Sequence, residues 1–93
     1  MAKRFRNIVG PAIRRERERL GLTQEQLAAR LGAAGLHGFD RVTVAKIEAQ
    51  IRSVFDYELE LVARILKTDI GGLYPGRKAL DEALPALLEG RRV

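Results

Sequence analysis

A short segment in the middle of the chain places one arginine, one valine and one lysine on the same side of a predicted helix. Val44 and Ile47, three residues apart, mark the buried face of this helix, so Arg41, Val42 and Lys46 face outward. Arginine can bind the O6 and N7 atoms of guanine with two hydrogen bonds, valine can contact the thymine methyl group, and lysine can reach a guanine or a phosphate. If this helix lies in the major groove of DNA, these three residues can contact bases, with a simple phosphate contact as the alternative for Arg41.

Two predicted helices that cross closely hold this segment in place. The first begins at Thr23, which forms a capping box with Gln26. We expect Gly32 to end it in the left-handed conformation, with Gly35 as the alternative terminator. The second begins at Asp40, a good N-cap. Two such helices, the second short and partly polar, are typical of a helix-turn-helix, which favours DNA binding.

A larger set of residues, in order along roughly three quarters of the chain, supports a family resemblance. They are Ile13 and Arg17, then residues 21–24, then Leu27, Ala28, Leu31 and Gly32, then residues 43–48, and finally Leu59, Val62, Ala63 and Leu66. Through them, residues 8–75 resemble the DNA-binding domain of the phage lambda repressor and Cro family (Xre-type transcriptional regulators). The resemblance implies an all-α, compact five-helix domain that binds double-stranded DNA sequence-specifically, as a dimeric repressor on a symmetric operator.

The turn inside the helix-turn-helix departs from the family pattern. Ten residues lie between Gly32 and Thr43, more than is usual there. Because the small and apolar positions match on both sides, the insertion belongs to the turn and to neither helix. Leu36 and Phe39 are apolar anchors within it, so we expect a compact loop packed on the core.

The resemblance also implies roles for individual polar residues. The three outward residues named above occupy the positions of the family's base contacts. Gln24 is a phosphate contact in the family, and a helix N-terminus suits an anion. Thr43 and Arg52 are further phosphate candidates, although Arg52 can equally be a solvent-exposed loop charge. Arg17 and Glu48 match a structural ion pair that fixes the third helix against the first.

Caps and apolar spacing predict the remaining elements. Helices are expected over residues 11–20, 24–31, 41–49 and 57–67. Pro11 suits a first helical position, and Asp56 is a good N-cap for the fourth helix. Gly71 and Gly72 each cost about 1 kcal/mol relative to alanine in a helix interior. The fifth element, residues 69–74, is therefore expected to be one distorted turn.

Positive charge is concentrated at the start of the chain. Residues 1–20 hold seven Lys or Arg against two Glu, and the remainder holds ten of each sign, so the formal charge of +5 lies in the first segment. Attraction to the phosphate backbone of DNA is one interpretation. A solvated helix face, in which Arg14–Glu18 and Glu16–Arg19 form ordinary surface pairs, is the other.

Three regions follow from these patterns. Residues 1–7 form a basic arm with no periodicity, expected to be mobile unless DNA orders it, in which Lys3, Arg4 and Arg6 are phosphate candidates. Residues 8–75 form the DNA-binding domain. Residues 76–93 form an amphipathic helical extension.

The extension has an apolar stripe that needs a partner surface. It comprises Leu80, Ala83, Leu84, Leu87 and Leu88, and Pro85 is expected to kink or split the helix near Leu84. Either the stripe folds back on its own domain or it forms a homodimer. The alternative function is accordingly a protein-interaction module, such as an antitoxin or adaptor, that uses this helix. A pure interaction scaffold, with groove entry blocked by the insertion, is less consistent with the basic arm.

Several classes of function are excluded by what the chain lacks. There is no cysteine and one histidine, His37, so no metal site or cofactor is expected, and His37 is expected in an exposed loop. No nucleophile, base and orienting group can be assembled, so we expect no enzymatic activity. No segment has the apolar length of a signal peptide or membrane span, which predicts a cytoplasmic protein.

Overall fold

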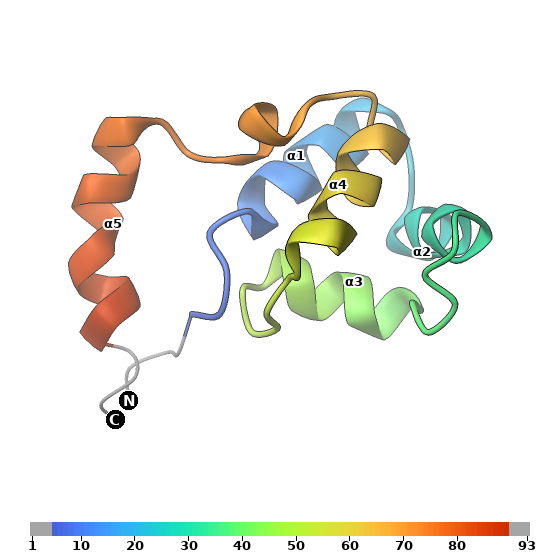
Figure 1. Cartoon of the computed structure of the whole chain (residues 1–93), viewed down its shortest axis with the longest axis horizontal. Coiled ribbons are helices and arrows are strands. Elements are labelled where there is room, and N and C mark those ends of the chain that lie inside the picture. Colours follow the sequence, from blue (N-terminus) through green and yellow to red (C-terminus); the bar gives the residue numbers. More distant parts are fainter. Residues whose placement is uncertain (1–4, 90–93) are drawn as a thin grey trace.

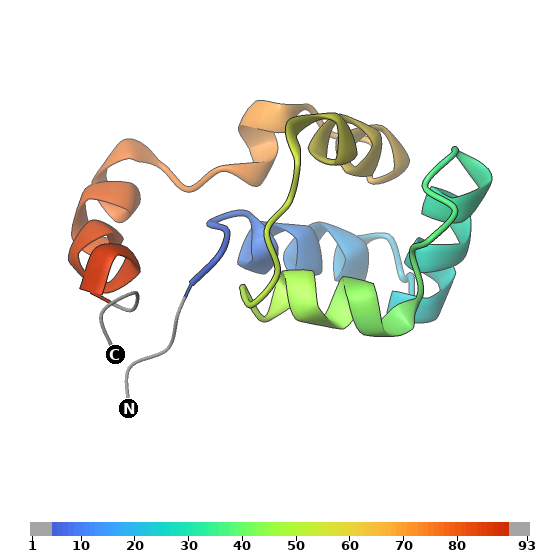
Figure 2. The ribbon, with the colours of Figure 1, turned by 60° about the horizontal axis from the view of Figure 1, so that its bottom comes forward.

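Helices make up the chain in the computed structural model, which describes residues 5–89. They are α1 (Gly10–Arg19), α2 (Gln24–Ala33), α3 (Arg41–Glu48), α4 (Asp56–Ile65), the 3-10 turn η1 (Ile70–Leu73) and α5 (Arg77–Glu89). The described residues contain no strand, which confirms the all-α prediction. In Figures 1 and 2, α1–α4 and η1 form one body and α5 stands apart from it.

The core lies between α1–α4 and η1. Its side chains include Ile13, Leu27, Val44, Leu66 and Leu73, each at most 2% exposed. Burying one such side chain contributes about 1.5–3 kcal/mol. The distorted turn expected near the two glycines is confirmed as η1, which buries Leu73 completely and lays Ile70 against the core. These contacts fix α3 against the other helices.

Gly10 allows α1 and α3 to meet backbone to backbone. A Cβ atom built at Gly10 would collide with the carbonyl oxygen of Ile47 and lie 2.9 Å from that of Glu48. Helix α1 begins at this glycine, one residue before the predicted start, and Pro11 occupies its first turn. After the Leu20 C-cap of α1, Gly21 reverses the chain with a φ of 71°. Only glycine fits at position 10 without moving α3.

The ends of α2 are partly as predicted. The capping box is confirmed, with Thr23 Oγ1 accepting from Gln26 N and Gln26 Oε1 accepting from Thr23 N. The prediction that Gly32 ends the helix is wrong, because Gly32 lies inside α2. Gly35 reverses the chain instead, with a φ of 120°. At this later reversal Leu36 N donates to Leu31 O (3.0 Å), and the Leu36 side chain reaches the core.

The start of α4 differs from the prediction. Asp56 is its first residue and not its N-cap, which is Phe55. Glu58 replaces the expected cap, because its Oε1 atom accepts from the backbone N–H of Phe55 at 3.0 Å. A carboxylate three residues into the helix thus satisfies the donor, as the second half of a capping box does.

Helix α5 continues through Pro85, so the expected split is absent. Proline removes one backbone hydrogen bond, and on an exposed helix water can satisfy the carbonyl group that loses it. None of the α5 residues is buried. An extended connection of three residues, 74–76, leads to α5 and holds it away from the body (Figure 1).

Candidate nucleic-acid interface

Helix α3 has one buried face and one open face. Asp40 is its N-cap as predicted, with Oδ1 accepting from Thr43 N at 2.8 Å. This hydrogen bond and a second one from the Thr43 hydroxyl lower the pKa of Asp40, so the cap stays ionised. Val44 and Ile47 are buried as predicted. The opposite side presents Arg41, Val42, Ala45 and Lys46, and Val42 is 46% exposed.

A buried ion pair holds the far end of α3. Arg17 Nε and Nη2 donate to the two carboxylate oxygens of Glu48 at 2.6 and 3.0 Å, and both residues are buried. Arg17 Nη1 also donates to Leu22 O at 2.8 Å. The hydrogen bonds to Glu48 raise the pKa of Arg17, so this guanidinium stays charged. The pair joins α1, the start of α2 and α3 at one point.

The phosphate candidates on α2 and α3 already have partners within the protein. Gln24 Nε2 donates to Glu48 Oε1 at 3.0 Å, which adds α2 to the buried network. Thr43 Oγ1 donates to Asp40 Oδ1 at 2.9 Å. Both side chains remain partly exposed, so their DNA contacts stay predictions.

Arg52 has a structural role that the sequence did not suggest. Its Nη1 and Nη2 atoms lie 3.1 and 3.2 Å from the carboxylate oxygens of Glu58. Its guanidinium also lies over the Phe39 ring, 5.1 Å from the centroid, a cation–π contact. Burial raises the pKa of Glu58, but hydrogen bonds from Arg52 and the Phe55 N–H outweigh it and lower that pKa. Glu58 lies six positions after Arg52, a spacing that no helical pattern detects.

The inserted turn is compact, as predicted. Leu36 and Phe39 are partly buried against the core. His37 is exposed, as expected for this loop. The Phe39–Arg52 contact attaches the turn to the segment between α3 and α4. The insertion is therefore part of the folded body beside α3.

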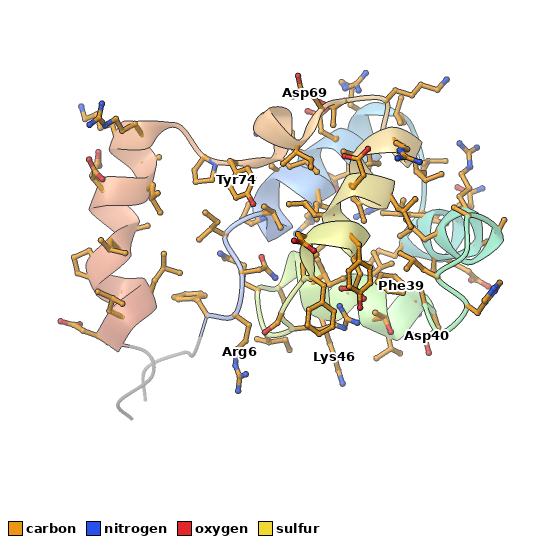
Figure 3. The ribbon with its side chains drawn as sticks, in the orientation of Figure 1. Arg6, Phe39, Asp40, Lys46, Asp69 and Tyr74 are labelled. Atoms are coloured by element: carbon orange, nitrogen blue, oxygen red, sulfur yellow. The ribbon has the colours of Figure 1, made fainter. Side chains whose placement is uncertain are left out.

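The end of the predicted N-terminal arm belongs to the body. Arg6 N donates to Gln50 O at 2.7 Å, and Asn7 Nδ2 donates to Ile47 O and Arg52 O at 3.0 and 2.8 Å. These two residues are held in place without DNA, contrary to the expectation of a mobile arm, because Asn7 binds one carbonyl group near the end of α3 and one in the loop after it. Figure 3 shows the side chains of Arg6 and Lys46 pointing to the same side of the molecule. Lys3 and Arg4 lie outside the described residues.

The arginines on the surface of α1 are paired with carboxylates, unlike Arg41 and Lys46 on α3. Arg14 pairs with Glu18, and Glu16 pairs with Arg15 and Arg19, at distances of 2.7–3.4 Å. These contacts, that to Arg19 first, lower the pKa of Glu16. The two surface pairs expected on α1, Arg14–Glu18 and Glu16–Arg19, are therefore present. Among residues 5–89, Arg41 and Lys46 form no ion pair, and neither do Arg6, Arg30, Lys67, Arg77 and Lys78, so α3 carries part of the unpaired positive charge.

Residues 5–89 contain neither a metal-binding cluster nor a membrane-spanning helix. No three or more His, Cys, Asp or Glu side chains gather as metal ligands there. In the same range, no helix combines the length and apolar character that crossing a membrane requires.

Comparisons with known proteins point to one family. A family model described as helix-turn-helix matches residues 13–73. A solved structure, hydroxypropylphosphonic acid epoxidase from S. wedmorenis, matches 80% of this chain with a TM-score of 0.65 and 25% identity. The match spans 36% of that enzyme, so it concerns part of the enzyme's chain. No curated protein matches.

Proposed function

The chain belongs to the helix-turn-helix family of DNA-binding regulators typified by the phage lambda repressor and Cro, and we propose that α3 recognises a specific sequence in the major groove. The observation that carries this proposal is the contrast between the two faces of α3. One face is anchored by apolar packing and a buried ion pair, and the other presents unpaired cationic side chains. A positioned helix with an open basic face is what major-groove recognition requires.

Base recognition is assigned to the start of the open face. Arg41 follows the N-cap and is placed to bind guanine O6 and N7, and Val42 beside it suits a thymine methyl group. Lys46 lies just over one helical turn beyond Arg41, so it reaches a neighbouring guanine or a phosphate. Such base contacts give specificity, whereas phosphate contacts fix the position of the protein.

Phosphate contacts are assigned to both sides of α3. Gln24, Thr43 and Arg52 are the proposed contacts of the body, and Arg6 extends the basic surface beyond the end of α3. Lys3 and Arg4, which lie outside the described residues, are the remaining proposed phosphate contacts. Each phosphate contact adds about 0.9 to the slope of log affinity against log salt.

Dimerisation is assigned to α5, so that two copies bind a symmetric operator. A cleft of about 260 Å³ separates the body from α5, with Pro11 and Ala12 on one wall and Leu80, Ala83 and Leu87 on the other. Leu84, at 44% exposed, extends this apolar surface into solvent. Two-fold packing would cover the stripe with its own copy and place recognition helices on half-sites about one DNA turn apart. Repression is the regulatory outcome that occupancy of such an operator most directly gives.

Selection of bound sites from random duplex DNA tests this function. We expect a two-fold symmetric consensus with guanine at one conserved position. Arg41→Ala should weaken binding to that site by about 1–3 kcal/mol and relax the preference at that position. Arg64→Ala, which removes an exposed arginine paired with Glu60 on α4, is the matched control and should leave binding unchanged. Equal losses on selected and random DNA would limit Arg41 to a phosphate contact.

A protein-interaction module is the second candidate, because α5 presents an apolar stripe of the kind that also suits a partner protein. In that case α5 would bind a different protein and the chain would act as an antitoxin or adaptor, with DNA binding kept or lost. Selection that yields no enriched site would favour this candidate. A non-enzymatic, cytoplasmic role stays our prediction under both.

A further inference from the structure

A depression of about 310 Å³ lies between the inserted turn, α3 and the start of α4. Its polar lining comes from His37 in the turn, Thr43 on α3, Arg52 in the following loop, and Tyr57 and Glu58 on α4. Four of these five side chains can donate hydrogen bonds. His37 belongs to the inserted turn, which is longer than the corresponding turn of the family.

The Arg52–Glu58 pair joins two sides of this depression and shields the Glu58 carboxylate. The Glu58 side chain is 6% exposed, and its oxygens accept hydrogen bonds from Arg52 and from the Phe55 backbone. Arg52 in turn covers the Phe39 ring of the turn. The turn and the start of α4 thus form one surface in which the Glu58 carboxylate is covered, while the His37 and Tyr57 side chains are exposed.

The position of the depression determines what it can meet. Thr43 lines it and is adjacent in sequence to Val42, on the open face of α3. The major groove is about 12 Å wide and a helix with side chains is about 10–12 Å across, so a helix in the groove fills it. Protein beside that helix therefore meets the sugar–phosphate backbone that borders the groove.

We propose that the inserted turn binds the sugar–phosphate backbone beside α3, with His37 as its cationic contact. This inference rests on the proposed DNA binding by α3. It assigns a function to the insertion, namely to extend the phosphate-binding surface along one edge of the groove.

The net charge of the depression depends on His37. Arg52 and Glu58 neutralise each other, and Tyr57 and Thr43 are uncharged near neutral pH. Asp40, the N-cap of α3, lines a neighbouring depression with Glu25. His37 is therefore the group in the lining that can give the depression a net positive charge. Histidine changes charge between about pH 5 and 8, so DNA affinity should rise as the pH falls through this range.

The test measures dissociation constants at pH 5.5 and 7.5 for the wild type, His37→Gln and His37→Lys. An exposed ion pair gives at most about a fivefold effect, so we expect wild type to bind about threefold to fivefold more tightly at pH 5.5. His37→Gln should bind weakly at both pH values, and His37→Lys tightly at both. His37 is the chain's one histidine and is exposed, so neither variant should change the thermal midpoint.

Neutral methylphosphonate substitutions in the DNA identify the contact. Substitution at one backbone position bordering the groove should abolish the pH effect in the wild type. The same substitution should leave the pH profile of His37→Gln unchanged. A pH effect that persists in His37→Gln overturns the proposal, as does a wild type whose affinity is equal at both pH values. Wild type that binds no DNA at either pH refutes the proposed function itself.

Discussion

Helices α3 and α5 are both amphipathic, yet only α3 is held in place. Helix α3 has eight residues, buries three of them, and ends in an ion pair with α1. Helix α5 has thirteen residues and buries none. An apolar stripe thus shows that a surface needs covering, whereas polar contacts and close backbone packing decide where a helix lies. Loss of the contacts that hold α3 should therefore lower the stability of the fold. Changes to α5 should instead affect the assembly of two chains.

Removing one partner of the buried ion pair should have the largest effect. Glu48→Ala leaves Arg17 charged and buried, which typically costs about 3–5 kcal/mol of unfolding free energy. Urea denaturation measures this loss. Glu60→Ala, which breaks an exposed pair with Arg64, is the control and should cost less than about 1 kcal/mol. If both variants lose the same amount, the pair does not anchor α3.

Truncation after Gly76 tests α5 in the opposite way. Because α5 buries no residue, the truncated chain should keep nearly all of its unfolding free energy. It should sediment as a monomer and lose about a hundredfold in affinity for a two-site operator, since the second site is no longer linked. Leu84→Glu in the full chain should reproduce the loss of dimer. A large loss of stability on truncation would instead identify α5 as a cap on its own domain.

Gly10→Ala tests whether close backbone packing positions α3. The added methyl group meets the carbonyl oxygen of Ile47, and overpacking of this kind costs about 1–3 kcal/mol. Thermal unfolding measures the change. Gly38→Ala is the matched control, because a Cβ at Gly38 has open space around it and should leave stability nearly unchanged. Equal stabilities for the two variants would contradict a close contact between α1 and α3.

The Arg52–Glu58 pair should give the smallest effect and a defined pH dependence. The pKa of Glu58 is lowered in the folded protein. Its stabilising contribution is therefore present above the unfolded pKa, about 4.3, and is lost as the pH falls through the folded pKa. Glu58→Gln should cost about 1 kcal/mol at pH 7, and the difference from wild type should vanish in acid. A difference that stays constant down to pH 3 would show that the charge of Glu58 contributes nothing.

Local sequence patterns predicted the helices but not the contacts that join one helix to another. The caps at Thr23 and Asp40 depend on residues three positions apart, so the sequence is sufficient to identify them. Gly10 matters because of a carbonyl group 37 residues later, and Asn7 because of the carbonyl groups of Ile47 and Arg52, 40 and 45 residues later. The choice of Gly35 over Gly32 depends on whether Leu36 reaches the core. No pattern within one helix contains these contacts.

The open face of α3 could also be predicted, because its buried residues define it. The resemblance to the repressor family supplied Arg17 and Glu48, whose separation along the chain carries no periodic pattern. Arg52 and Glu58 had no such guide, and only the folded arrangement brings them together with Phe39.

The extended connection between η1 and α5 gives each DNA-binding body a tether. Its three residues, 74–76, span at most about 10 Å. In a dimer joined through α5, two such tethers would let the bodies shift by up to about 20 Å without separating the paired helices. That distance corresponds to about six base pairs along the DNA axis. Such a dimer would tolerate operators of unequal spacing, and shortening the tether would narrow the spacings that it accepts.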